Sequence, residues 1–510
     1  MPTTLATMAH PNFGAANYTV LFLYFAAMLF IGIWCGRSTG GAAAYFTGEG
    51  KVHHWLVGIS LLGTYLSSLT MMALPAVSFG AADFTWSVQL PFLLVTAVVI
   101  TGVVLPRYRK EGCVSVYEFL ERRIHVSSRL IAAIAFIVLS IGRMGLVLYL
   151  PALAFSVVTG AHLVWTIVVM GIVTSIYTVL GGIKGVIWTD VIQVVIFVVG
   201  AVATLFFVFA PGVDFWAAAS ASHKFRTLDL RTDLTQVVTL WLVLQTLFET
   251  IRIYATQQEM TQRYLTAEST RKANASVWMS ILGYIPLGYL FYFIGAALFV
   301  YYQANPEPAV ETLKSANRLD SLYAYFVVTR MPAGLAGLVI AAFFAAAMST
   351  IASSMNSCSA VCLEDFYKRF WGRNRSDEHY LKVAKSLALL WGVLTIVMAI
   401  LFMQISLAQV VWSKVMAVST CGVLGLMALA FLPWKVNRWA GITGVLVSYA
   451  CLIAMMFFVQ IKPGLALVYP LPKDSGISFL LWPVICNLVS FGVGLAIDRA
   501  WPRREPAPAA

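Results

Sequence analysis

Small polar residues interrupt two of the most apolar stretches of this chain of 510 residues. One stretch spans 63–70 and is followed by Pro75, and the other spans 345–354. With about 100° between successive residues of a helix, each stretch gathers hydroxyl-bearing residues on one face. The positions that share these two faces are Gly63, Leu66, Ser67 and Thr70 in the first stretch and Ala346, Ser349, Thr350 and Ser353 in the second.

The oxygen atoms on these two faces suit a small hard cation. Hydroxyl and carbonyl oxygens are the ligands that such cations prefer, and a helix broken by glycine and proline exposes its carbonyl groups and its ends to ions and solutes. Close packing of helices through small residues would produce the same pattern. The residues alone therefore leave two interpretations open, a cation site or a packing interface.

Two isolated charged residues lie in or beside apolar runs. Arg143 falls in the run 137–154, where an arginine costs about 3 kcal/mol on membrane-insertion scales. Nothing within one helical turn pairs with it, so it must face a partner helix or a wet cavity, binding either an anionic ligand or a distant carboxylate. Asp190 follows Trp188 and Thr189. Near a membrane end it could be a cap or lie among the headgroups, and otherwise it is a cation ligand or a counter-ion.

Other charged residues have local explanations. Glu249 and Arg252 are three positions apart, so on a helix we expect them to pair with each other. Lys414 lies near the outer end of an apolar run, and its long side chain can carry the amine to the membrane surface.

Composition places these residues in an integral membrane protein. Hydrophobic residues make up 60% of the chain and charged residues only 11%, whereas soluble domains carry about a quarter charged residues. The excess apolar surface must face lipid. The net charge of +12 comes from basic residues spread between apolar runs, which is typical of membrane topology rather than nucleic-acid binding. The sequence has no Walker loop, metal cluster or nucleophile motif, so we do not expect an enzyme.

The apolar runs predict about thirteen spanning helices, because one span needs about 20 apolar residues. An odd number puts the two chain ends on opposite sides of the membrane. The loops 106–129 and 361–385 and the C-terminus are rich in Lys and Arg, which predicts a cytoplasmic C-terminus and an external N-terminus. The predicted spans are 18–36, 55–80, 83–105, 128–158, 163–182, 187–211, 235–256, 276–302, 333–360, 384–404, 408–433, 439–460 and 477–498.

Several of these segments resemble the sodium:solute symporter family. The most specific is YTVLGGIKGVIWTDVIQ at 177–193, and the segments 67–75, 262–265 and 349–354 support it. Within the family, the chain is most similar to the bacterial sialic acid symporters. The segments and residue that carry this closer resemblance are LSSLT at 66–70, Gln89, IGR at 141–143 and the run 177–193.

The resemblance implies an all-α membrane protein with a LeuT-type core of two inverted five-helix repeats. We expect the first repeat at 55–211 and the second at 235–433. One extra helix at 18–36 would precede the core, and two helices at 439–498 would follow it. The whole chain would form one transmembrane transporter domain.

The resemblance also assigns roles to residues. It implies a sodium site between the first and eighth core helices, with the ligands Gly63, Leu66, Ala346, Ser349 and Thr350. A second sodium ion would bind Asp190, Ser349 and Ser353, but residue 352 of this chain is alanine where the pattern has serine. The planar guanidinium of Arg143 would hold the solute's carboxylate. The implied solute-binding residues are Tyr65, Ser67, Thr70, Trp86, Gln89 and Arg143.

Together these features predict sodium-coupled symport by alternating access in the inner (plasma) membrane of a bacterium. The expected partners are sodium ions, the lipid bilayer and a small anionic solute, most simply a carboxylated sugar such as sialic acid (N-acetylneuraminate). Because Tyr65, Glu249 and Arg252 depart from the sialic acid pattern, a neutral sugar, inositol, a monocarboxylate or a vitamin remains an alternative. An ion channel or a solute sensor is the alternative of another class, and the sequence leaves the oligomeric state open.

Overall fold

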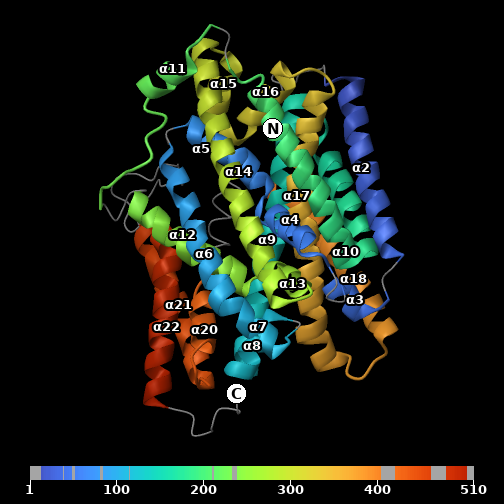
Figure 1. Ribbon diagram of the computed structural model, residues 1–510, viewed down its shortest axis with the longest axis vertical. Helices are drawn as coiled ribbons and strands as arrows, with labels where there is room; N and C mark the ends of the chain where they lie inside the picture. Colours follow the sequence, from blue (N-terminus) through green and yellow to red (C-terminus); the bar gives the residue numbers. More distant parts are fainter. Residues whose placement is uncertain are drawn as a thin grey trace.

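The fold is a bundle of long helices, and among the described residues it contains no strand (Figure 1). The computed structural model describes residues 13–37, 40–48, 52–80, 84–113, 115–209, 212–232, 238–316, 318–403, 420–460 and 478–501. The longest helices are α2 (Gly14–Gly36), α9 (Val126–Thr159), α10 (Leu163–Leu205), α12 (Thr239–Thr256), α14 (Thr270–Ala304), α17 (Leu335–Val361), α18 (Asp377–Phe402), α21 (Arg438–Gln460) and α22 (Trp482–Ala500).

Shorter helices join or extend the long ones. The span Phe84–Glu111 is continuous but changes its winding along its length, from η2 (Phe84–Phe92) through α6 (Leu93–Val99) and η3 (Ile100–Val104) to α7 (Leu105–Glu111). The other short helices are α3 (Ala42–Thr47), α4 (His54–Tyr65), α5 (Ser68–Phe79), α8 (Val116–Arg123), α11 (Phe215–Ala221), α13 (Gln258–Leu265), α15 (Pro308–Ser315), η4 (Leu319–Ser321), α16 (Leu322–Arg330), η5 (Cys362–Trp371), α20 (Val423–Ala430) and η6 (Phe479–Leu481).

Nine helices of the described residues are long and apolar enough to cross a membrane, or ten if the bent pair α4–α5 is one span. Three differences separate the larger number, ten, from the thirteen spans predicted. Helix α10 counts once here, although its backbone leaves the helical region at Gly182. Helix α12 carries Glu249 and Arg252 and is not among the nine. The first part of the predicted span 408–433, with Lys414, lies outside the described residues. The number thirteen stays a prediction.

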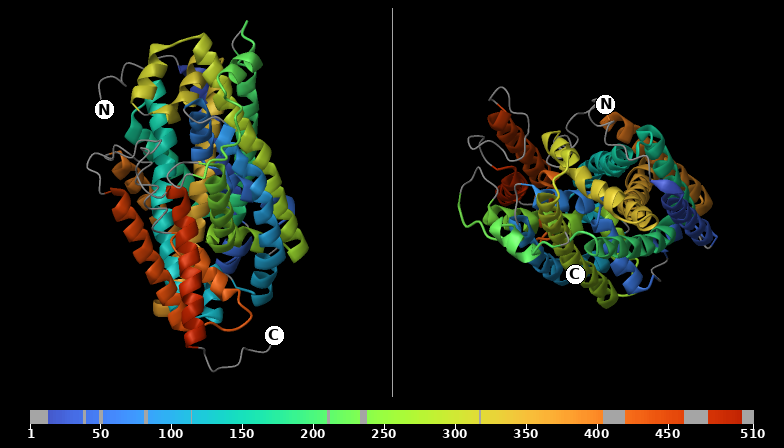
Figure 2. Two further views of the ribbon diagram at one scale, coloured as in Figure 1. Left: turned by 90° about the vertical axis from the view of Figure 1, so that its left-hand side faces the viewer. Right: turned by 90° about the horizontal axis from the view of Figure 1, so that it is seen from above.

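Helix α17 forms the centre of the bundle. In its apolar window 89% of residues are buried, against 28% for α2, and α9, α10 and α18 pack around it (Figure 1). Peripheral helices expose large apolar side chains, as Phe22 and Phe30 of α2 do, which is the surface expected to face lipid. Helices α21 and α22 pack against each other at the edge of the bundle (Figure 2).

The interruption predicted in the second span is confirmed. Helices α4 and α5 meet at an angle of 54°, and Leu66 and Ser67 between them have extended backbones. Ser67 and Thr70 form a capping box, in which each side chain accepts a hydrogen bond from the other residue's backbone amide. Because Ser67 and Thr70 cap the start of α5, the local sequence itself favours a new helix start at this position.

Basic segments that are far apart in the chain lie together at one end of the molecule. Helices α7 and α8 and the η5 segment lie at the end where α22 terminates, whereas α2 begins at the opposite end (Figure 1). Glu121 of α8 accepts hydrogen bonds from Arg129 and from Arg369 of η5, both at 2.8 Å. The two loops that the sequence marks as basic are therefore held against each other by ion pairs.

Lys224, just after α11, anchors its segment to the C-terminal end of α5. Its buried ammonium group donates hydrogen bonds to the carbonyl oxygens of Ser78, Phe79 and Gly80 at 2.8–3.0 Å, and it lies 4.1 Å from the centre of the Phe299 ring. The last carbonyl groups of a helix have no partner within the helix, and the negative end of the helix dipole favours a cation.

We expect Lys224→Met to lower the midpoint of thermal unfolding of the purified protein by several degrees. Methionine keeps the length of the side chain but loses charged hydrogen bonds, each worth about 1.5–3 kcal/mol. Lys314→Met is the matched control, because Lys314 pairs with Glu311 at an exposed site, where such pairs contribute about 0–1 kcal/mol. Equal midpoints for the two variants would contradict the anchoring role of Lys224.

Candidate functional site

The break between α4 and α5 faces α17, and one hydroxyl group connects them. Thr350 of α17 donates to the carbonyl oxygen of Leu66 at 3.5 Å and to that of Ala346 at 3.2 Å. All three residues are buried. Two carbonyl oxygens and one hydroxyl oxygen from two helices therefore converge where the backbone of the broken helix has no partner in its own helix.

Gly63 lets α4 approach two other helices at the same place. A Cβ atom at Gly63 would lie 2.9 Å from Cγ2 of Val194, 3.3 Å from Oγ of Ser349 and 3.5 Å from Cβ of Asp190. Any side chain at position 63 would push against α10 and α17. The structure therefore brings together Gly63, Leu66, Ala346, Ser349 and Thr350, the five residues that the sequence analysis assigned to one sodium site.

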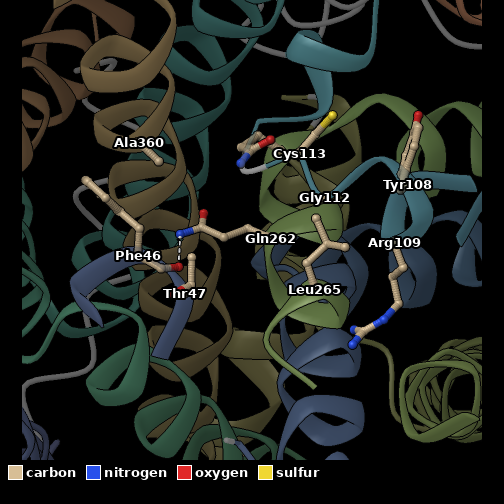
Figure 3. Close-up of a pocket in the computed structure, with 10 residues that line it drawn as sticks. Phe46, Thr47, Tyr108, Arg109, Gly112, Cys113, Gln262, Leu265 and Ala360 are labelled. Atoms are coloured by element: carbon tan, nitrogen blue, oxygen red, sulfur yellow. Dashed lines mark hydrogen bonds between the residues drawn. The ribbon is translucent and has the colours of Figure 1, made fainter. Parts of the chain in front are cut away.

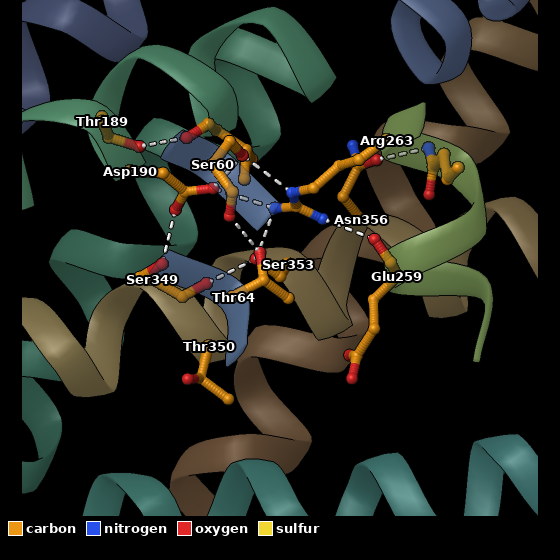
Figure 4. Close-up of polar contacts among 12 residues, drawn as sticks. Ser60, Thr64, Thr189, Asp190, Glu259, Arg263, Ser349, Thr350, Ser353 and Asn356 are labelled. Carbon is orange, nitrogen blue, oxygen red and sulfur yellow. Dashed lines mark hydrogen bonds and ion pairs between the residues drawn. The ribbon is translucent and has the colours of Figure 1, made fainter. Parts of the chain in front are cut away.

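Asp190 is completely buried in the middle of α10, so the interpretation as a cap at a membrane surface is wrong. Its carboxylate accepts hydrogen bonds from Ser349 at 2.6 Å and from Ser60 at 2.5 Å. It also pairs with Arg263 of α13, whose Nη2 lies 3.0 Å from Oδ2 (Figure 4). Two hydroxyl groups and a guanidinium thus surround this carboxylate.

Arg263 also holds the other residue predicted for a second sodium ion. Its Nη2 donates to Ser353 Oγ at 2.5 Å and its Nε to Ser60 Oγ at 2.8 Å, and its side chain has no exposed surface. The sequence analysis included Arg263 only in the segment 262–265 and missed its contact with Asp190. The sequence signal that could have indicated this contact was an arginine in a polar segment between two predicted spans.

Arg143 pairs with a carboxylate on a distant helix. Its Nη1 donates to Glu259 Oε1 of α13, and its Nη2 donates to the backbone oxygen of Thr64, beside the break, at 3.3 Å. Ser354 of α17 donates to the other oxygen of Glu259 at 2.7 Å. Of the two interpretations of Arg143, a distant carboxylate is therefore present, and the sequence analysis had not identified Glu259 as that partner.

The remaining residues predicted for the solute extend from the break toward α12 and α14. Gln89 of η2 accepts a hydrogen bond from Thr246 at 2.8 Å and donates one to Tyr292 at 3.2 Å. Tyr65 packs edge-on against Tyr284, with ring centres 4.5 Å apart. Trp86 is half-buried on η2, and Ser67 and Thr70 form the cap of α5.

The predicted pair on α12 is confirmed. Arg252 donates to Glu249 at 2.9 and 2.6 Å through Nε and Nη2. The arginine side chain is 3% exposed and that of the glutamate 16%, so the pair is largely shielded. Its two charges satisfy each other.

A cavity of about 260 Å³ lies against α13 (Figure 3), at the end of the molecule that carries α3 and α7 (Figure 1). Gln258, Gln262 and Leu265 of α13 line it, together with Arg109 and Cys113. Gln262 also donates to the carbonyl oxygen of Phe46 at 2.7 Å and to Asn356 at 2.8 Å. Helix α13 thus both lines this cavity and contacts Asp190 through Arg263.

Comparison with known proteins shows which family the chain resembles. The model of the sodium:solute symporter family matches residues 45–448. The chain is 34% identical to the sodium/sialic acid symporter SiaT of Proteus mirabilis, over 88% of this chain and 90% of that protein. It is 32% identical to the sodium/sialic acid symporter NanT of Aliivibrio fischeri, over 88% of each chain. Human sodium-coupled monocarboxylate transporter 2 is 29% identical over 93% of this chain and 75% of its own length.

Solved structures agree with this assignment. A substrate-bound, outward-open sodium-coupled sialic acid symporter superposes with a TM-score of 0.84 at 31% identity, over 98% of this chain and all of that chain. The nucleobase-cation symporter Mhp1, at 13% identity and a TM-score of 0.54 over 89% of this chain and 95% of its own, shares the fold. The fold is thus an all-helical LeuT-type architecture, and the molecule is a sodium-coupled transporter rather than an enzyme. The chain belongs to the sodium:solute symporter family.

Proposed function

We propose that this protein carries a sialic acid such as N-acetylneuraminate into a bacterial cell together with sodium, by alternating access. The observation that carries the proposal is Arg143, a guanidinium beside the break of the α4–α5 helix, in a chain more than 30% identical to two sodium/sialic acid symporters. Arginine binds a carboxylate through two parallel hydrogen bonds, and a sialic acid carries one carboxylate.

The broken helix supports a cation and an anion side by side. The last carbonyl groups of α4 carry partial negative charge and the first amide groups of α5 carry partial positive charge. We assign sodium to the oxygen atoms of Gly63, Leu66, Ala346, Ser349 and Thr350. The solute would lie between the start of α5 and Arg143, against Tyr65, Ser67, Thr70, Trp86 and Gln89.

Sodium and solute must then favour the same conformation. If sodium stabilises the outward-open bundle in which the solute binds, the solute tightens sodium binding by the same factor. After both have bound, the helix bundle would rock to open inward. The proposed core consists of the inverted repeats at 55–211 and 235–433, with 18–36 before them and 439–498 after them. The basic end formed by α7, α8 and η5 supports a cytoplasmic C-terminus and an external N-terminus, because Lys and Arg collect on the cytoplasmic side.

We further propose that one sodium ion accompanies each solute. Arg263 already supplies a positive charge to Asp190 and Ser353, two residues of the candidate second sodium site. Residue 352, a further position of that site, is alanine and has no oxygen in its side chain. A guanidinium with fixed hydrogen bonds thus stands where the second ion would need to bind.

A monocarboxylate is the second candidate solute, because the relatives at about 29% identity include sodium-coupled monocarboxylate transporters. Such an anion would use the same guanidinium. The alternatives of an ion channel and a solute sensor are not proposed, because the chain belongs to a family of sodium:solute symporters.

The solute can be identified by thermal unfolding of the purified protein in NaCl and in KCl. We expect N-acetylneuraminate to raise the midpoint in NaCl only, since a ligand at 100 times its Kd stabilises by about 2.7 kcal/mol. Neutral hexoses should have no effect. Arg143→Lys keeps a charge for Glu259 but loses the planar fork, so it should reduce N-acetylneuraminate uptake more than tenfold and preserve the shift caused by sodium alone. Normal uptake by this variant would contradict the carboxylate role.

Ser349→Ala should raise the sodium concentration for half-maximal uptake about tenfold, which corresponds to about 1.4 kcal/mol. The variant loses a proposed sodium ligand and the hydrogen bond to Asp190. Ser359→Ala is the control on the same helix, because that hydroxyl is buried and bonded within α17 to Met355. Similar sodium dependence in the two variants would remove Ser349 from the sodium site.

Transport of one sodium ion with one monoanion moves no net charge. We therefore expect proteoliposomes to take up N-acetylneuraminate at a rate that does not change with membrane potential, whereas each unbalanced charge would contribute about 2.3 kcal/mol per 100 mV. A current that follows solute addition to the native protein would disprove the single-sodium proposal. A current seen only in the variant Ala352→Ser would show that the native protein lacks a second sodium ion because residue 352 is alanine, and not because Arg263 occupies the site.

A further inference from the structure

Glu259 lies where a solute carboxylate is proposed to bind. It is 1% exposed and sits in the first turn of α13. One of its carboxylate oxygens accepts from Arg143 and the other from Ser354, and its backbone oxygen accepts from Arg263 at 2.8 Å. Figure 4 shows Glu259 beside Arg263, with Ser353 and Asn356 nearby.

Both terminal nitrogen atoms of Arg143 are engaged by the protein itself. Nη1 donates to Glu259 and Nη2 to the backbone oxygen of Thr64. These two nitrogen atoms form the fork that grips a carboxylate in two parallel hydrogen bonds. These contacts use two of the five N–H groups of the guanidinium. A solute carboxylate that pairs with both terminal nitrogen atoms therefore competes with Glu259 for Nη1.

We propose that Glu259 is a built-in competitor for the solute's carboxylate and that the solute is admitted by exchange of carboxylates on Arg143. The inference rests on the function proposed above. In the empty transporter Arg143 and Glu259 neutralise each other. After one sodium ion and one monoanion have bound, the charges of Arg143, Glu259, the sodium ion and the anion again sum to zero. The net charge of the core is therefore the same before and after loading.

The exchange also acts on α13. A carboxylate that loses its cation inside the protein is strongly disfavoured unless it finds another partner or water. The cavity lined by Gln258, Gln262 and Leu265 lies against the same helix, so displacement of Glu259 favours movement of α13 toward this space. Solute binding at the break is thereby linked to the end of the molecule where α3 and α7 lie.

The exchange makes Glu259 a determinant of charge specificity. While Glu259 occupies the fork, only the fraction of molecules with a free guanidinium can bind the anion, and the apparent affinity falls by that fraction. A neutral solute does not use the fork and gains nothing when Glu259 is removed. Anionic and neutral probes therefore separate a competitor from a residue that merely supports the fold.

The test measures Kd in saturating NaCl for N-acetylneuraminate, its neutral methyl ester and pyruvate. We expect Glu259→Gln, which keeps the shape of the side chain, to bind the anions about fivefold or more tightly than the native protein. Ser354→Ala removes the hydrogen bond that orients Glu259 and should tighten anion binding to a smaller extent. Affinity for the ester should not change in either variant. Glu249→Gln, which removes a carboxylate that is paired with a different arginine, Arg252, should match the native protein.

The outcomes separate this inference from the proposed function. If the native protein binds N-acetylneuraminate and Glu259→Gln binds it equally or more weakly, with Ser354→Ala unchanged, the exchange is disproved and the function stands. If neither anion binds the native protein but one binds Glu259→Gln, the exchange is supported and the proposed function fails. If neither anion binds any variant while sodium still raises the unfolding midpoint, both are disproved.

Discussion

A charge buried inside an apolar bundle must be paired, and the pair of Arg263 with Asp190 satisfies this constraint at the centre of the molecule. Neither side chain has exposed surface. Because removing one partner of such a pair leaves an uncompensated charge, its loss is strongly destabilising. Ser60 of α4 and Ser353 of α17 complete the hydrogen bonds of the guanidinium. The pair thereby fixes the positions of α4, α10, α13 and α17, the four helices around the proposed sodium site.

The broken helix depends on the same surroundings. Leu66 and Ser67 interrupt the helical hydrogen bonds, and non-helical backbone at membrane depth is tolerated only where protein groups or a wet cavity satisfy it. Thr350 reaches Leu66 from α17, Arg143 reaches Thr64 from α9, and the cap of α5 is internal. The groups that satisfy the backbone at the break and so stabilise it are thus the groups proposed to contact the ion and the solute.

Helix α13 connects two charge pairs that serve different proposed partners. Arg263 binds Asp190 beside the proposed sodium site, and Glu259, four residues earlier, binds Arg143 beside the proposed solute site. Displacement of either pair would act on the same short helix. Coupling between two ligands requires an element whose position both of them bias, and α13 has the contacts for that role.

The sequence alone determined the features that depend on local geometry. The helical period put Gly63 and Leu66 on one face, the hydroxyls and Pro75 predicted the break, and a spacing of three predicted the pair of Glu249 with Arg252. It also marked Arg143 and Asp190 as costly charges without naming their partners. Only the tertiary structure decided that Arg143 meets Glu259 and that Asp190 meets Arg263, residues 116 and 73 positions apart. Helical periodicity relates residues within a turn or two, whereas these contacts depend on how separate helices pack.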